Sequence, residues 1–221
     1  MHATCTDHTP SDPQRARPEF TAALILTGGR SRRMGSEKYR LRIGGETVLQ
    51  RIIRITSPVA SAITLIASAE QDFAAETLPH GIEILRDSQP GRGPLPAVVD
   101  GMQYLIARNP QMESCYVLAC DMPLVTTELL QLISNSLRRD DDAVVPFDGN
   151  QLQPLCGLYR TFTCQTAGQL LARDCWKMTD FCDAIHTRRL MPEQMISVSP
   201  DLQCLMNMNT PEDYERILQQ L

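Results

Sequence analysis

The sequence predicts an α/β protein whose mostly parallel sheet is covered by helices on both faces. Short apolar segments rich in β-formers alternate with segments of helical periodicity over most of the chain. This alternation is typical of strand–helix units and of a three-layer α/β/α arrangement. No internal repeat and no linker follows residue 20, so residues 21–221 are expected to form a single domain. The polar, proline-bearing residues 1–20 are expected to form a disordered N-terminal tail.

The first half of the chain contains most of the expected parallel strands. The segment 21–27 is a short apolar run typical of a buried strand. Similar runs predict further strands at 62–68, 82–87 and 115–120. Helices are expected at 47–56, 70–78 and 94–110, the last closed by an Asn-Pro pair. In the first of these helices the apolar residues share one face: Val48, Leu49, Ile52 and Ile53.

The second half of the chain makes the expected sheet a mixed one. An amphipathic pattern predicts a helix at 126–139. The segments 143–147 and 153–159 bracket the turn Asp148-Gly149-Asn150, which predicts a hairpin or closely paired strands. Residues 161–187 are expected to be mainly helical.

The last helix has the clearest boundary signals. Thr210 is the expected N-cap, and Pro211 fits the first helical position. Asp213 stands near the positive end of the helix dipole. The apolar residues that follow are expected on one face: Tyr214, Ile217, Leu218 and Leu221.

Composition excludes several classes of protein. A net charge of −5 and a pI near 5.4 argue against general nucleic-acid binding. No apolar run approaches the ~20 residues that span a bilayer, and the first twenty residues are unlike a secretory signal. We therefore expect a cytoplasmic protein with no membrane or nucleic-acid partner. The eight cysteines contain no C-x-x-C pair, so they are expected to be reduced packing residues and not zinc ligands.

A basic loop is the first candidate for chemistry. Residues 28–42 carry six basic residues against Glu37 alone, directly after the first expected strand. Gly28 and Gly29 allow backbone N–H groups to approach a phosphate, and arginines add bidentate hydrogen bonds. The loop matches neither a Walker motif nor G-x-G-x-x-G. The alternative is a solvated basic surface loop.

Two aspartates are expected at the same edge of the sheet, because ligands of open α/β sheets bind at the carboxyl ends of the strands. Asp121 ends an apolar strand and is expected to anchor Mg²⁺, which takes one or two protein carboxylates together with phosphate oxygens. The alternative for Asp121 is a helix cap. Asp87 and the flexible turn 91–94 that follows it are expected at this edge as well. The alternative is that the turn is only an ordinary strand–helix connection.

Five motifs resemble those of the molybdenum cofactor guanylyltransferases, a MobA-like family of nucleotidyltransferases. They follow the family order and span residues 21–221. The resemblance implies a Rossmann-like fold of the nucleotide-diphospho-sugar transferase type. The motifs are LTGGRSRRMGSEK (26–38), LRDSQPGRGPLPAV (85–98), LACDMPLV (118–125), QPLCGLY (153–159) and NMNTPEDY (207–214).

The resemblance implies transfer of GMP from GTP to the phosphate of molybdopterin or Mo-molybdopterin, with release of pyrophosphate. It also implies Mg²⁺ as cofactor and a role for each matching residue. Lys38 and Arg33 would act on the phosphates, and Asp121 would bind the metal. The residues implied to contact the nucleotide are Leu26, Thr27, Gly28, Gly29, Lys38, Asp87 and Asp121. Those implied on the pterin side are Asn207 and Asn209.

The sequence departs from the family pattern at three places. Thr27 stands where a small alanine is usual, and Glu37 replaces the common aspartate before the lysine. After the second strand the family often has an asparagine that contacts the nucleotide, and Ser68 is the nearest candidate here. For Asn207 and Asn209 the alternative role is only to shape the turn into the last helix.

The expected mechanism is positioning and electrostatics, because an attacking phosphate and GTP are both anions. The sequence shows no Ser/His or Cys/His nucleophile arrangement. Two other functions remain open. One is a cytidylyltransferase for the same cofactor or another small phosphate. The other is a catalytically silent GTP-binding partner that delivers the cofactor. The partners expected of the enzyme itself are GTP, molybdopterin or Mo-molybdopterin, and, in transient contact, molybdoenzymes or their chaperones.

Overall fold

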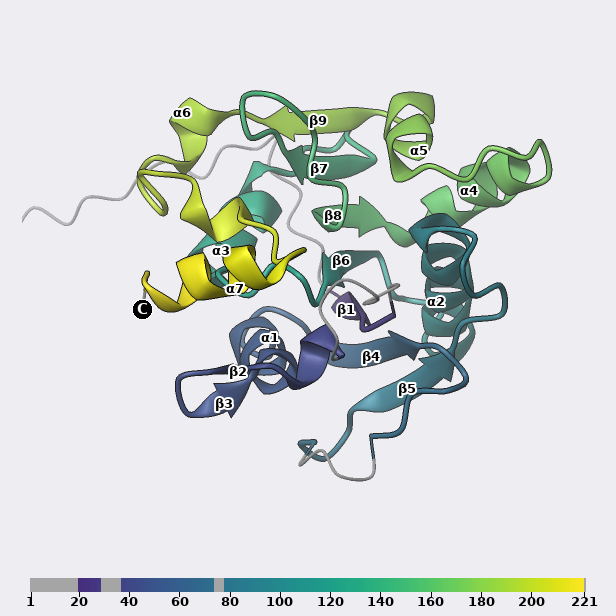
Figure 1. The fold of residues 1–221 in the computed structure, drawn as a ribbon. Helices are drawn as coiled ribbons and strands as arrows, with labels where there is room; N and C mark the ends of the chain where they lie inside the picture. The colour runs from purple at the N-terminus through teal and green to yellow at the C-terminus, as the bar shows by residue number, and fades with distance from the viewer. Residues whose placement is uncertain (1–19, 29–36, 74–77, 221) are drawn as a thin grey trace, which may run out of the picture.

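The computed structural model describes residues 20–28, 37–73 and 78–220. In these segments the strands form a seven-stranded sheet in the order β5-β4-β1-β6-β8-β7-β9 (Figure 1). Strand β8 is antiparallel to both of its neighbours, and the other neighbouring pairs are parallel. The expectation of a mostly parallel mixed sheet is confirmed. The strands are β1 (Thr21–Leu26), β4 (Ala62–Ala67), β5 (Glu83–Arg86), β6 (Ser114–Ala119), β7 (Ala143–Pro146), β8 (Cys156–Arg160) and β9 (Thr187–Leu190).

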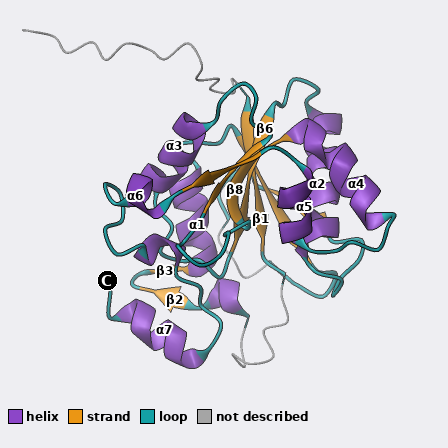
Figure 2. Cartoon of the chain, turned by 90° about the horizontal axis from the view of Figure 1, so that it is seen from above, coloured by secondary structure: helices purple, strands orange, loops and turns teal. Residues whose placement is uncertain are grey.

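Helices cover both faces of this sheet (Figure 2). One face carries α1 (Val48–Thr56), α3 (Thr127–Ser136), α6 (Pro192–Met195) and α7 (Pro211–Leu218). The other carries α2 (Pro94–Arg108), α4 (Cys164–Leu171) and α5 (Met178–Ala184). Short 3₁₀ turns are η2 (Lys38–Arg40), η3 (Thr161–Thr163) and η4 (Gln203–Leu205).

The sheet separates two apolar cores, because successive side chains of a strand point to opposite faces. Along β1, Ala23 and Ile25 pack with α1 and α3, whereas Ala22 and Leu24 pack with α2. Gly101 of α2 lies so close to the sheet that a Cβ there would come within 2.7 Å of a Leu24 methyl group. Strand β1 is therefore buried on both of its faces.

Strand β9 is absent from the sequence prediction. Residues 161–187 are mainly helical, as predicted, and the residues that follow are too highly charged to indicate a strand. Thr187-Arg188-Arg189-Leu190 pairs in parallel with β7 at the sheet edge. Arg188 forms an ion pair with Asp141 at 2.5 Å, which satisfies its charge on the sheet surface. With two adjacent arginines, β9 lacks the alternation of apolar residues that indicates a strand. A small hairpin of β2 (Arg42–Ile43) and β3 (Glu46–Thr47) was also not expected.

The helix expected at 70–78 is wrong over residues 70–73 and 78, which are not helical; residues 74–77 lie outside the described segments. The reason is a competing set of side-chain hydrogen bonds. Gln71 is buried and uses its amide to link the ends of β1 and β4. Phe73 is buried against Tyr39, with ring centroids 5.0 Å apart. Tertiary contacts override the helical pattern here.

Helix α7 starts where its cap signals predict. Thr210 accepts a hydrogen bond from the Asp213 backbone N–H, and the Asp213 carboxylate bonds back to the Thr210 N–H. The expected apolar face is buried only in part, because Ile217 is fully buried whereas Leu218 is 37% exposed. Leu221 lies outside the described residues.

The expected tail at residues 1–20 also lies outside the described segments, apart from Phe20. Seven of the eight cysteines are described, and all seven are free. Six of them are buried, as expected for packing residues. In the described part of the chain, no helix combines the length and the apolar character needed to cross a bilayer.

Candidate functional site

The candidate site lies at the carboxyl edge of the parallel strands. Strands β1, β4, β5 and β6 run parallel in the sheet, so the segments that follow them meet at one edge. Backbone hydrogen bonds hold these strand ends together: Cys120 N–H donates to the Leu26 carbonyl at 3.1 Å, and Asp87 N–H donates to the Ala67 carbonyl at 2.8 Å. Open α/β sheets bind their ligands at this edge.

Three polar side chains from distant parts of the chain meet there, and we call Lys38, Asp121 and Asn209 the polar cluster. The Lys38 ammonium donates to the Asn209 side-chain oxygen at 2.8 Å and lies 3.5 Å from the Asp121 carboxylate. The Lys38 side chain is 15% exposed and that of Asp121 is 28% exposed. A charged group with so little exposure is costly unless it has partners, and Lys38 has an amide and a carboxylate.

The C-terminal segment is attached directly to the end of β6. Met208 N–H donates to the backbone carbonyl of Asp121 at 2.7 Å, and Met208 itself is fully buried. Asn209 follows and lies one residue before the Thr210 cap of α7. The structure therefore places Asn209, implied on the pterin side, beside the two residues implied to act on the phosphates and the metal.

A second group of polar residues lies at the ends of β1 and β4, and we call Thr27, Ser68 and Gln71 the amide network. The Gln71 side chain donates to the Thr27 carbonyl at 3.0 Å and accepts from the Ser68 N–H at 2.9 Å. Its oxygen also accepts from the Thr27 hydroxyl at 3.2 Å. That hydroxyl lies 3.0 Å from the Ile66 carbonyl as well. The Thr27 side chain, implied to line the nucleotide, thus bonds within the protein.

Sequence reasoning missed Gln71. The residue sits in a segment whose periodicity predicts a helix, and nothing local separates it from a surface glutamine. Only its 8% exposure and its bonds to Thr27 and Ser68 identify it. Ser68 itself is half-buried, and its carbonyl accepts from the Arg86 guanidinium at 2.9 Å.

The remaining implied nucleotide contacts fall into three groups. Leu26 is buried at the end of β1, and Gly28 is exposed beside the Ser68 N–H. Asp87 stabilises the loop that follows it, because its carboxylate accepts a hydrogen bond from the Gln89 N–H at 2.9 Å. Gly29 and Arg33 lie outside the described residues.

Asn207 is part of a separate hydrogen-bonded chain. Its side-chain nitrogen lies 3.5 Å from the Gln153 oxygen, and Gln153 donates to the Asp148 carboxylate at 2.6 Å. Burial by itself would raise the pKa of Asp148, but hydrogen bonds from the Gln151 and Asn150 N–H groups and from Gln153 outweigh it and lower that pKa. The predicted turn at 148–150 is thereby held against the C-terminal segment.

The carboxylate of Asp121 fits a magnesium ion that is shared with a nucleotide. Among the described residues, no group of three or more His, Cys, Asp or Glu side chains could enclose a metal. Mg²⁺ bound together with a triphosphate needs only one or two protein carboxylates, and the Asp121 carboxylate is partly exposed. The described residues therefore do not enclose a metal by themselves.

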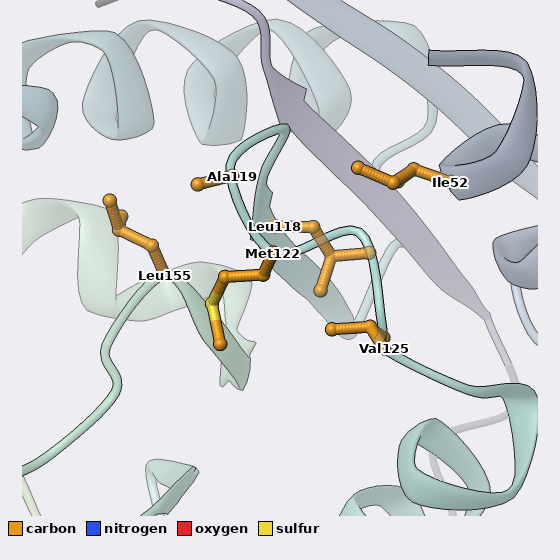
Figure 3. Close-up of a pocket in the computed structure, with 6 residues that line it drawn as sticks. All are labelled: Ile52, Leu118, Ala119, Met122, Val125 and Leu155. Atoms are coloured by element: carbon orange, nitrogen blue, oxygen red, sulfur yellow. The ribbon is translucent and has the colours of Figure 1, made fainter. Parts of the chain in front are cut away.

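A small apolar hollow lies at the end of β6 (Figure 3). All of its lining side chains are apolar: Ile52, Leu118, Ala119, Met122, Val125 and Leu155. Such a lining offers no group that could orient a phosphate or a base. The hollow is therefore a packing feature.

Comparison with known proteins identifies the family of the chain. A family described as the MobA-like NTP transferase domain matches residues 23–183. A probable molybdenum cofactor guanylyltransferase from Carboxydothermus hydrogenoformans is 30% identical over 88% of this chain and 93% of its own length.

Solved structures share the fold, which confirms the predicted nucleotide-diphospho-sugar transferase type. Molybdopterin-guanine dinucleotide biosynthesis protein A from Archaeoglobus fulgidus superposes with a TM-score of 0.74 at 21% identity, over 90% of this chain and 97% of that one. A 4-diphosphocytidyl-2C-methyl-D-erythritol synthase from Anaerococcus prevotii superposes with a TM-score of 0.66 at 15% identity, over 91% of this chain and 97% of that one.

Proposed function

Because the chain belongs to the family of MobA-like NTP transferase domains, we propose that it transfers GMP from GTP to the phosphate of molybdopterin or Mo-molybdopterin and releases pyrophosphate. The named relative at 30% identity supports the guanylyl donor and the cofactor. The proposal includes Mg²⁺, a cytoplasmic location and transient contact with molybdoenzymes or their chaperones.

The observation that carries the proposal is the position of Lys38. Its ammonium lies at the junction of the basic loop, the end of β6 and the start of α7, with 15% of its side chain exposed. The acceptor phosphate and the triphosphate repel each other, so a fixed cation between their binding segments lowers the cost of bringing them together. Asn209 holds the ammonium through a neutral amide oxygen and leaves its positive charge uncompensated on that side.

Asp121 would hold the metal in this reaction, with phosphate oxygens as the other ligands. When bound, Mg²⁺ would neutralise charge on the triphosphate and on the leaving pyrophosphate. The chain's own contribution is geometric: the Met208 N–H bonds to the backbone carbonyl of Asp121, so the segment that carries Asn209 is joined to the end of β6. No protein nucleophile is required.

The test is a product assay on the purified chain with molybdopterin, Mg²⁺ and either GTP or CTP. We expect a guanine dinucleotide and pyrophosphate from GTP. A product from CTP alone would identify a cytidylyltransferase, and nucleotide binding with no product would identify a silent carrier; either result contradicts the proposal.

The two lysines of the chain provide a matched pair for the same assay, since Lys38 and Lys177 are the only ones. Lys177 is exposed at the start of α5. We expect Lys38→Ala to lower kcat/KM by on the order of 10²-fold, because a fixed cation is lost, whereas Lys177→Ala stays within about twofold. Equal effects from both variants would contradict the role of Lys38.

A further inference from the structure

The N-terminal turn of α7 extends the polar cluster by one residue. The Asp213 carboxylate accepts the backbone N–H of Asn209 at 3.0 Å and the N–H of Thr210 at 2.9 Å. The side chain of that same Asn209 accepts from Lys38 at 2.8 Å. One carboxylate oxygen of Asp213 therefore lies two hydrogen bonds from the ammonium of Lys38.

The charge state of Asp213 suits such a role. Hydrogen bonds from the Asn209 N–H, and then from Thr210, outweigh the effect of burial and lower the pKa of Asp213. The carboxylate is thus ionised at neutral pH, and charge-assisted bonds to backbone N–H groups are stronger than neutral ones. The other side of the helix turn is anchored as well, because the Tyr214 hydroxyl donates to the Arg42 carbonyl at 2.6 Å.

Within the described segments, few other contacts fix Asn209. The Asn209 residue is exposed, so apolar packing does not hold it. Its backbone N–H is fixed by Asp213, and its preceding neighbour Met208 is bound to the Asp121 carbonyl at 2.7 Å. An asparagine on an exposed turn would otherwise sample several conformations, and side-chain order has an entropic cost.

We propose that Asp213 is a positioning residue: it fixes the backbone of Asn209 and, through the Asn209 amide, the ammonium of Lys38. This inference rests on the proposed function for its catalytic consequence, but not for its structural one. A helix cap alone would also explain an aspartate at this position. The two roles differ in whether Lys38 responds to the loss of Asp213.

Lysine resonances measure this response directly. With only two lysines, isotopically labelled lysine gives one NMR signal from Lys38 and one from Lys177. We expect Asp213→Ala to move the Lys38 side-chain signal toward that of a solvated lysine, whereas the Lys177 signal stays in place. Asp213→Asn keeps one acceptor oxygen, so we expect it to restore part of the shift.

Two neighbouring substitutions are the controls. Thr210→Ala removes the cap oxygen that accepts the Asp213 N–H, and Glu212→Ala removes an exposed negative charge from the same turn. Both keep the Asp213 bond to Asn209, so both should leave the Lys38 signal unchanged. An unmoved Lys38 signal in Asp213→Ala, or an equal shift in Thr210→Ala, would overturn the proposal.

Turnover gives the second readout. We expect Asp213→Ala to lower kcat about tenfold, as for a modest misplacement of a catalytic group, and to add no further loss in an Asn209→Ala background. Additive losses would show that Asp213 acts independently of Asn209 and would overturn the inference. If the wild type transfers no guanylyl group, the proposed function fails, yet the NMR comparison in the free protein still decides whether Asp213 positions Lys38.

Discussion

The polar cluster and the amide network lie at the same edge of the sheet but differ in how their polar groups are satisfied. In the amide network, the buried Gln71 side chain is bonded on both its oxygen and its nitrogen, to backbone groups of Thr27 and Ser68 and to the Thr27 hydroxyl. In the polar cluster, Lys38 and Asp121 are partly exposed and face each other at a long 3.5 Å.

This difference separates polar groups that stabilise the fold from polar groups that are available to bind a ligand. A buried amide that is bonded on both its oxygen and its nitrogen stabilises one backbone geometry. A cation and a carboxylate that are partly exposed and only loosely paired can exchange their mutual contact for contacts to phosphate and metal. Substitutions in the two groups should therefore affect different quantities: turnover in the polar cluster and the free energy of unfolding in the amide network.

The largest expected effect is in the polar cluster. Asp121→Asn removes the carboxylate charge and keeps the size of the side chain, so we expect turnover to fall by on the order of 10²–10³-fold. The thermal midpoint should change little, because the Asp121 contacts that hold the fold are made by its backbone carbonyl. Asp140→Asn, at an exposed position, is the control for a lost charge. Near-normal turnover in a folded Asp121→Asn protein would rule out Asp121 as a metal ligand.

The amide network should give the opposite result. Gln71→Leu leaves the Ser68 N–H without its acceptor and the Thr27 carbonyl without its amide donor, and unsatisfied groups of this kind cost about 1–3 kcal/mol. We expect the free energy of unfolding to fall by about 2 kcal/mol in denaturant titrations, with kcat of the folded fraction retained. A loss of turnover at unchanged stability would erase the distinction between the two groups.

The smallest effect is expected inside β4, where Thr64 provides the contrast to Gln71. Among the described residues, its hydroxyl is a fully buried side-chain oxygen without a hydrogen-bond partner. Thr64→Val removes that unsatisfied group and nearly keeps the shape, so we expect stability to rise by about 1 kcal/mol. A lower unfolding midpoint in denaturant would show that the hydroxyl has a partner in solution.

Much of the site could be predicted from local sequence. Asp121 ends a continuous apolar strand, and Lys38 follows a glycine-rich turn after another, so both are assigned to the same edge by strand order alone. The capping box of α7 is likewise predictable, because its residues Thr210 and Asp213 are three positions apart. The capping box is predictable because it depends only on residues within one turn of the helix.

What only the tertiary structure decided involves contacts between distant residues. Lys38 and Asn209 are 171 positions apart, and Thr27 and Gln71 are 44 apart, so no periodicity links either pair. Strand β9 and the non-helical residues 70–73 were missed for the same reason: an ion pair to Asp141 and the bonds of Gln71 stabilise conformations that local propensity does not favour. The sequence by itself determined which chemical groups reach the edge of the sheet. The folded chain determined which of them touch, because the free energy of those contacts depends on packing that brings remote segments together.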